Sequence, residues 1–365
     1  MIHKYKEVKN KIIEWAHNER YKPHEKIPTE SELMAMFNVS RHTIRKAISD
    51  LDAEQYVYRI QGSGIYLSNW RENDIYLKKN NNVGVLTTHI SNYIFPDIIR
   101  GVETLICAEA YSLLVSSTNN NVMFENSNLK NLLAHKIDGL ILEPTKSAYQ
   151  AHNIGYLTNM LTQNIPFVMI NASYPEIKAP SLLVDDFIGG KIATEHLISL
   201  GHKHIMGIFK VDDSQGINRM NGFVAKCQER DILPTSNQIL TYLSEETKTV
   251  LPQRIETILK SEKRPSGIFC YNDEIAYMVI NIAHSLGLKI PEELSIVGFD
   301  DSSLSKIIEP NLTSLTHPKE NMGRDAAKLI IKLIKNGNHY EDSDSILYEP
   351  KLIIRNSTSR FKNTK

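Results

Sequence analysis

The sequence predicts a chain of majority α/β structure, with a small helical domain at its N-terminus and a larger domain of parallel sheets behind it. Apolar residues recur at helical spacing within the first 52 residues, whereas short apolar runs alternate with helix-length segments after residue 82. A polar, Asn-rich stretch separates the two patterns. Because 365 residues suffice for two or three domains, we divide the chain into residues 1–68, a linker at 69–82 and residues 83–365.

Composition limits the classes of protein to which the chain can belong. Lys and Arg together number 42, as do Asp and Glu, so any contact with nucleic acid must come from a local patch. The three cysteines lie far apart and predict neither a disulfide framework nor a metal site; we expect no cofactor. No signal segment and no run of about 18 apolar residues occurs, so we expect a cytoplasmic protein without a membrane span.

The first predicted element is an amphipathic helix over residues 4–20. Its apolar face carries Tyr5, Val8, Ile12 and Trp15. Lys4 stands at the start of this helix, where it could reach a phosphate group or simply be solvated.

Two further helices follow, joined by a tight turn. Thr29 and Glu32 form a T-x-x-E capping box at the start of the first, and Ser40 caps the second. The second helix has an apolar stripe at i, i+3, i+4 and i+7, made of Ile44, Ala47, Ile48 and Leu51. Arg41, His42 and Arg45 fall on its first turns, away from the stripe. This pattern predicts a recognition helix for a DNA major groove; the alternative is a helical hairpin whose basic face is merely solvated.

A hairpin is predicted directly after these helices. Two β-prone runs, at 55–60 and 65–67, flank the turn Gln61-Gly62-Ser63-Gly64. Glycines at the tip allow close approach to another backbone, and Gln61 can donate to base edges or phosphate. Its position favours a wing beside a helix-turn-helix, although an ordinary hairpin is the alternative.

Residues 4–67 resemble the winged-helix domain of the GntR family. The motifs are I-P-T-E-S-E-L (27–33), V-S-R-H-T-I-R-K-A (39–47) and Q-G-S-G (61–64). This chain has Ile65 where the family commonly has Thr after the last wing glycine, so a hydroxyl for phosphate is missing there. The resemblance implies DNA contacts from the second helix and the wing tip. The candidate DNA-binding residues are Lys4, Glu30, Arg41, His42, Thr43, Arg45, Gln61, Gly62, Ser63 and Gly64.

Seven apolar runs after residue 82 are predicted strands. They lie at 83–88, 111–118, 137–145, 165–173, 204–212, 265–273 and 294–301. Strands that alternate with helices at this spacing form parallel sheets covered on both faces. Ligands of such sheets bind at the carboxyl ends of the strands, where the polar residues of these runs fall.

Residues 82–358 resemble the LacI/GalR effector domain, a two-lobed fold similar to type I periplasmic binding proteins. The motifs include R-M-N-G-F (219–223), Y-N-D-E-I-A (271–276) and P-E-E-L-S-I-V-G-F-D-D (291–301). A GntR-type head on a LacI-type body resembles the repressors of arabinose utilisation in Gram-positive bacteria. The resemblance implies a homodimer that binds double-stranded operator DNA and is released by a sugar, L-arabinose.

Polar side chains at strand ends are the candidates for sugar contacts, because hydroxyl groups need charged or bidentate partners and ring faces need aromatic walls. Arg219 is expected to open a helix, and the resemblance implies that it grips sugar oxygens; a surface ion pair is the alternative. Within Asn272-Asp273 and Asp300-Asp301 we expect one residue to cap a helix and the other to bind, and the resemblance favours Asp300. Phe95 could equally be a core aromatic residue. The candidate set is His89, Tyr93, Phe95, Glu143, Lys146, Asn171, Asp185, Arg219, Asn272, Asp273, Asp300 and His317.

Two other functions compete with that of a sugar-controlled repressor. Carboxylates in a sugar cleft are also typical of glycosidases, but the chain has no P-loop, G-x-S-x-G, H-E-x-x-H or pyridoxal-lysine signature and no evident catalytic dyad. An exported binding protein would need a signal peptide. We therefore expect no catalytic residue. Another pentose, a phosphosugar or a disaccharide would use the same residue types as arabinose.

Overall fold

The computed structural model describes residues 4–18, 20–53, 56–60, 62–69, 80–149, 151–232 and 234–362. The chain divides into two compact units, Met1–Asn80 and Asn81–Lys365, each of which is considered by itself. Their architecture confirms the predicted fold class: a small helix-turn-helix unit and a two-lobed α/β unit. None of the helices in the described ranges is long and apolar enough to cross a membrane.

The described residues of the first unit form three helices and a hairpin. They are α1 (Lys4–His17), α2 (Glu30–Phe37), α3 (Arg41–Ala53), β1 (Val57–Ile60) and β2 (Gly64–Leu67). The capping box is present: the backbone N–H of Thr29 donates to Glu32 Oε2 at 2.7 Å, and that of Glu32 to Thr29 Oγ1 at 3.4 Å. The predicted stripe on α3 is fully buried, together with Leu33 of α2. Helix α1 ends three residues earlier than expected, and the chain then turns so that the N–H of Arg20 donates to Trp15 O.

The predicted hairpin is present and is antiparallel around the glycine turn. Val57 pairs with Leu67, and Ile60 with Gly64. Gly62 has a φ of 78°, a conformation in which a side chain would be strained. Gln61, a predicted DNA contact, lies outside the described residues.

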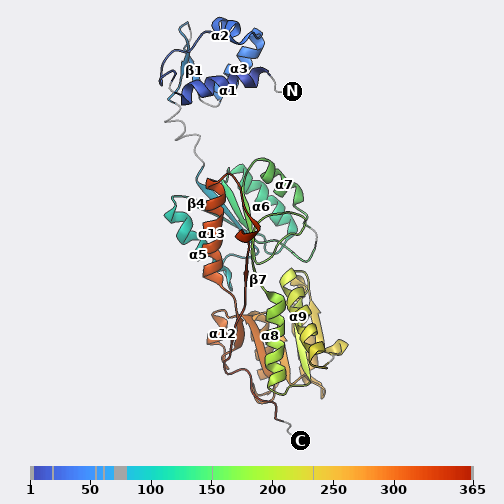
Figure 1. Cartoon of the computed structure of the whole chain (residues 1–365). Coiled ribbons are helices and arrows are strands. Elements are labelled where there is room, and N and C mark those ends of the chain that lie inside the picture. The colour runs from blue at the N-terminus through green and yellow to red at the C-terminus, as the bar shows by residue number, and fades with distance from the viewer. Residues whose placement is uncertain are drawn as a thin grey trace. The chain divides into compact units, whose positions relative to one another are not determined.

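The first lobe of the second unit contains a six-stranded parallel sheet in the order β13-β7-β6-β5-β3-β4. Its strands are β3 (Asn82–Thr87), β4 (Ser112–Ser117), β5 (Gly139–Leu142), β6 (Phe167–Ile170), β7 (Ser181–Val184) and β13 (Ile346–Tyr348). Helices α5 (Phe95–Ala108) and α13 (Lys319–Lys335) cover one face, and α6 (Val122–Ala134) and α7 (Ile154–Thr162) cover the other (Figure 1).

The second lobe has a sheet in the order β14-β12-β11-β10-β8-β9, in which only β14 is antiparallel to its neighbour. Its strands are β8 (Ile205–Lys210), β9 (Ile239–Tyr242), β10 (Gly267–Cys270), β11 (Ser295–Asp300), β12 (Thr313–Thr316) and β14 (Leu352–Ile353). One face packs against α8 (Asp186–Ser199) and α9 (Ser214–Glu229), the other against α10 (Leu251–Lys260) and α11 (Asp273–Ser285). Short elements complete the unit: η1 (Ser236–Gln238), η2 (Ser244–Glu246), α12 (Leu304–Ile307) and η3 (Asp342–Asp344).

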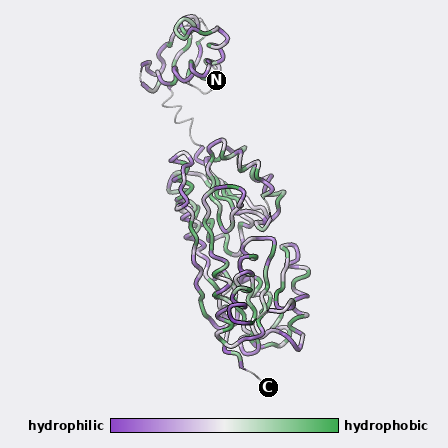
Figure 2. Tube along the Cα trace, turned by 45° about the vertical axis from the view of Figure 1, so that its right-hand side comes forward, coloured by the Kyte–Doolittle hydropathy of each residue, from purple (hydrophilic) through white to green (hydrophobic). Residues whose placement is uncertain are grey.

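All seven predicted strands are present, but β7, β9, β12, β13 and β14 were not predicted as strands. These are short, and most lie at or next to a sheet edge, where burial is partial and the apolar run is weak. Apolar residues concentrate along the inner strands and hydrophilic ones along the outer surface (Figure 2).

The two lobes are joined by three passages of the chain, which leave β7, β12 and β13. All three strands lie at or next to one edge of their sheets. As a result, α13 and β13, which come late in the sequence, belong to the first lobe. Helix α13 packs closely on α5, because Gly101 and Gly323 have no side chain and a Cβ at either position would come within 2.2 Å of a backbone oxygen.

The first lobe also buries a carboxyl group away from the cleft, and this makes stability depend on pH. Glu125 is 1% exposed. Burial raises its pKa from 4.5 to about 7, although a hydrogen bond from Tyr174 opposes the shift. The folded state therefore holds a proton that the unfolded chain releases near pH 4.5, so stability falls as the pH rises through 7.

We predict that Glu125→Gln raises the free energy of unfolding above pH 7 by roughly 3 kcal/mol, because the neutral amide needs no proton. Below about pH 4.5 the two proteins should be equally stable. Urea unfolding followed by circular dichroism across this range would measure the difference. A wild-type protein that gained stability relative to the variant as the pH rose would contradict the prediction.

Candidate functional site

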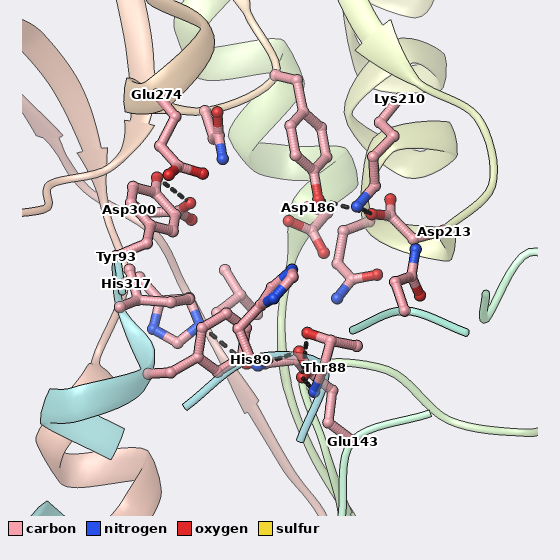
Figure 3. A pocket seen from close by; sticks show the side chains of 18 of the residues that line it. Thr88, His89, Tyr93, Glu143, Asp186, Lys210, Asp213, Glu274, Asp300 and His317 are labelled. Atoms are coloured by element: carbon pink, nitrogen blue, oxygen red, sulfur yellow. Dashed lines mark hydrogen bonds and ion pairs between the residues drawn. The ribbon is translucent and has the colours of Figure 1, made fainter. Parts of the chain in front are cut away.

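A polar cavity of about 110 Å³ lies between the two lobes, at the carboxyl ends of both parallel sheets (Figure 3). Its walls come from the turns after β3, β5 and β6 in the first lobe and after β8, β10 and β11 in the second. Nine predicted sugar contacts line it: His89, Tyr93, Phe95, Glu143, Asn171, Arg219, Asn272, Asp300 and His317.

Arg219 organises the second-lobe wall. It is 4% exposed; its Nε donates to Asp186 Oδ1 at 2.8 Å and its NH2 group to Asp300 Oδ1 at 3.3 Å. The guanidinium also lies 3.6 Å from the centroid of the Phe299 ring. The expected position at a helix start is wrong, because α9 begins five residues earlier, at Ser214. The ion pairs are buried rather than at the surface, and the plane of Arg219 is thereby held in one orientation.

On the first-lobe side, a chain of hydrogen bonds runs from Thr88 to His317. The N–H and hydroxyl of Thr88 both donate to Glu143 Oε2 at 2.7 Å, and Asn171 Nδ2 donates to Glu143 Oε1 at 2.8 Å. Asn171 Oδ1 lies 3.0 Å from His317 Nε2. Burial lowers the pKa of His317 to about 4, so its ring is neutral at physiological pH and Nε2 carries the proton donated to Asn171.

Two further clusters complete the cavity. Lys210 Nζ lies 2.7 Å from Asp213 Oδ2, to which the hydroxyl of Tyr271 donates at 2.6 Å; Asp213 also caps α9. Across the cavity, the hydroxyl of Tyr93 donates to Asp300 Oδ2 at 2.5 Å, so this residue connects the lobes (Figure 3). Phe95 lines the cavity and meets the edge of the His89 ring, with 5.6 Å between centroids.

Three predicted sugar contacts do not line the cavity. Asp185 caps α8 by accepting from Ile188 N, and its neighbour Asp186 faces the cavity instead. Asp273 is fully buried behind the wall, where Ser302 and Ser314 donate to both of its oxygens. Asn272 both caps α11 and lines the cavity, so the expected division of roles in this pair is wrong.

Lys146 is the third predicted sugar contact that does not line the cavity. Its ammonium group contacts Glu245 and Asp212 of the second lobe, beside the cavity rather than within it.

Eleven lining residues were not predicted: the apolar Ile94, Pro144 and Val184, and also Thr88, Asn120, Asp186, Lys210, Asp213, Gln215, Tyr271 and Glu274. Most of them are next to a strand end or a predicted contact in sequence, which is the signal that could have revealed them. The lining contains five carboxylates, namely Glu143, Asp186, Asp213, Glu274 and Asp300, against the two cations Lys210 and Arg219. This balance suits a ligand without negative charge.

The first unit presents a separate polar surface on the first turns of α3. Arg41, His42 and Arg45 are exposed there, and Thr43 is partly buried, with its hydroxyl 2.9 Å from that of Ser40. Glu30 accepts from Arg45 Nε at 3.1 Å and lies 4.0 Å from Arg59 of the wing. Glu30 therefore holds the guanidinium of Arg45 against the start of α2 through Nε, and the two terminal nitrogens of the guanidinium can donate to another partner.

The remaining predicted DNA contacts are at the start of α1 and in the wing. Lys4 is exposed at the first position of α1. Gly62 and Ser63 are exposed at the wing tip, Gly64 is partly buried, and the hydroxyl of Ser63 lies 2.5 Å from that of Tyr66. The exposed members place hydrogen-bond donors at the start of α3 and on the wing.

Comparison with protein families assigns both units. Residues 4–67 match the model of bacterial regulatory proteins of the gntR family, and residues 194–358 match that of a periplasmic binding protein-like domain. A winged helix in front of a two-lobed binding domain defines a sugar-responsive transcription repressor of mixed GntR and LacI type, as the sequence predicted.

Several relatives match nearly the whole chain, and they include two arabinose metabolism transcriptional repressors. An arabinose metabolism transcriptional repressor from Halalkalibacterium halodurans is 44% identical over 98% of this chain and 96% of its own. One of the same name from Geobacillus stearothermophilus is 41% identical over 98% of each chain. The chain belongs to the family of these arabinose metabolism transcriptional repressors.

A solved structure has the same fold as the second unit. A LacI family transcriptional regulator from Enterococcus faecium, determined with bound ribose, is 25% identical and superposes with a TM-score of 0.65 over 77% of this chain and 100% of its own. The bound ribose was observed in the structure of that regulator.

Proposed function

We propose that this protein represses arabinose-utilisation genes and that L-arabinose, bound in the cavity between the lobes, releases it from its operator. The observation that carries the proposal is the cavity itself, which is small, largely enclosed by polar side chains, and walled by both lobes. Its fixed carboxylates, amides and guanidinium match the donor and acceptor pattern of sugar hydroxyls. The names of the 41–44% identical relatives support the choice of arabinose.

The charge of the lining argues for a neutral sugar rather than a sugar phosphate. The lining has five acidic side chains, and its two cations are already paired: Lys210 with Asp213, and Arg219 with Asp186 and Asp300. The same pairing argues against a glycosidase, because most carboxylates in the cavity already accept from neighbouring side chains. We therefore propose a binding protein without catalytic activity.

On the DNA side, we propose that Arg41 and Arg45 read base edges and that Lys4, His42 and the wing position the protein on phosphate. A homodimer would present two such heads to a near-palindromic duplex. Sugar binding has to change operator affinity by only about 1–3 kcal/mol to act as a switch.

The proposal predicts the outcome of one titration series. The operator is first selected from a pool of random duplexes with the full-length protein. L-Arabinose should then bind with measurable heat in calorimetry and weaken operator binding roughly 5- to 150-fold in fluorescence anisotropy. Arabinose 5-phosphate should do neither, and light scattering should show a dimer. Release by the phosphorylated sugar alone would contradict the proposal, as would hydrolysis of an arabinoside by the purified protein.

A further inference from the structure

The two lobes contact each other at a second place, on the side of the cleft away from the three chain passages. The residues concerned follow β4 and β5 in the first lobe and β8 and β9 in the second. In both sheets these strands lie in the half opposite the edge that carries the passages. Contacts at this position close the cleft at the point where separation of the lobes would be greatest.

Lys146 is the central residue of this contact. Its Nζ lies 2.5 Å from Glu245 Oε1 and 3.7 Å from Asp212 Oδ2, both in the second lobe. The side chain of Asp212 is completely buried; within the described part of the chain its Oδ2 also accepts from Ser244 N, and no donor reaches its Oδ1. Lys146 therefore adds to the compensation of the Asp212 charge, to which Lys210 of the second lobe also contributes, and the contribution of Lys146 is made only while the lobes are together.

The backbone of Lys146 supports the same interpretation. Its φ is 45°, in the left-handed region that a lysine rarely adopts. The conformation is held by Asn120, whose Oδ1 accepts from Lys146 N at 2.8 Å. Such an outlier persists where surrounding contacts over-determine it, which is typical of segments that position a functional group.

Two hydrogen bonds accompany the ion pairs across the same gap. Asn120 Nδ2 donates to Ser244 Oγ at 2.8 Å, and the N–H of Ser214 donates to Ser147 Oγ at 2.9 Å. Ser214 is the first residue of α9, so its N–H has no acceptor within the helix. Its protection from solvent exchange thus reports whether the lobes are closed.

We propose that Lys146 is a positioning residue: with Asn120 and Ser147 it forms a latch that stabilises the closed arrangement of the lobes, so that Lys146 influences the affinity for the sugar without itself touching the sugar. This inference rests on the proposed function, because it assumes that the sugar binds between the lobes. The apparent affinity for a sugar that binds only the closed state is proportional to the fraction of protein that is closed. The latch would raise that fraction before the sugar arrives.

The first test needs no sugar. Hydrogen exchange of full-length protein, read by mass spectrometry on the peptide that contains Ser214, should be faster in Lys146→Met than in the wild type. Lys263→Met removes an exposed lysine before β10 and is the matched control, which should exchange as the wild type does. Equal exchange in all three proteins would overturn the proposal.

The second test uses L-arabinose as the probe in calorimetry. Lys146→Met should weaken binding about tenfold, and Glu245→Gln should add little to it in the double variant, because the partner is already gone. Raising salt from about 0.1 M to about 1 M should weaken binding by the wild type more than by Lys146→Met.

The outcomes separate the two proposals. Loss of arabinose binding in Lys146→Met with unchanged exchange at Ser214 would show a direct sugar contact and overturn the latch. If the wild type bound no arabinose, the proposed effector would fail, while the exchange comparison would still decide whether the latch exists.

Discussion

Replacing Arg219 by leucine is expected to destabilise the two-lobed unit by about 3–5 kcal/mol and to abolish release by sugar. The guanidinium compensates Asp186 and Asp300, which are both 5% exposed or less. Leucine would leave two buried carboxylates unpaired, and the cavity would lose its only arginine among the described lining residues. Urea unfolding would measure the loss of stability, and operator titrations with increasing arabinose would measure the loss of release.

Two further variants would test whether the burial of unpaired charge causes the expected loss of stability. Adding Asp186→Asn and Asp300→Asn to Arg219→Leu should recover most of the stability but not sugar binding, because neutral amides need no counter-charge. Arg230→Leu is the matched control: Arg230 follows α9, is half exposed and pairs with Glu195, and its loss should cost at most about 1 kcal/mol. Equal destabilisation by the two arginine substitutions would argue against a special role for Arg219.

Arg45→Ala is expected to weaken operator binding by about 1–3 kcal/mol and to reduce discrimination between operator and random duplex. Its side chain is 63% exposed on the first turns of α3, and one of its nitrogens is held by Glu30. Because the interaction with Glu30 is at the surface, the stability of the first unit should change little. Fluorescence anisotropy with both duplexes would measure affinity and discrimination.

Lys11→Ala provides the comparison for Arg45→Ala, since it removes the same charge from α1, where Lys11 pairs with Glu14. It should leave discrimination intact. Operator affinity that is unaffected by Arg45→Ala, or discrimination lost equally in both variants, would show that α3 does not read bases.

Patterns of several residues predicted the fold well. The capping box, the stripe on α3 and the apolar runs each depend on burial that repeats along an element, so that one ambiguous residue does not alter the conclusion. Strands β9 and β13 escaped prediction because only alternate residues of β9 are buried and no residue of β13 is, so that the tertiary setting rather than the local sequence makes them strands.

Individual site residues were harder to predict, for a geometric reason. At a strand end followed by a helix, two adjacent polar residues point in different directions, and the sequence does not show which one caps the helix. Asp185 caps and Asp186 faces the cavity, whereas in the next pair Asn272 does both and Asp273 is buried. Lys146 was correctly placed at a strand end, but its side chain crosses to the other lobe.

The three passages between the lobes have a consequence for truncated forms of the protein. The first sheet cannot be completed until β13, near residue 348, has been synthesised, and α13 must also be present to cover one of its faces. A premature stop codon before β13 would therefore leave both lobes unfinished, because the first sheet would lack β13 and the second β14, rather than deleting one lobe and sparing the other. Partial digestion by a protease should likewise release either the intact second unit or small fragments, but no single lobe that is stable by itself.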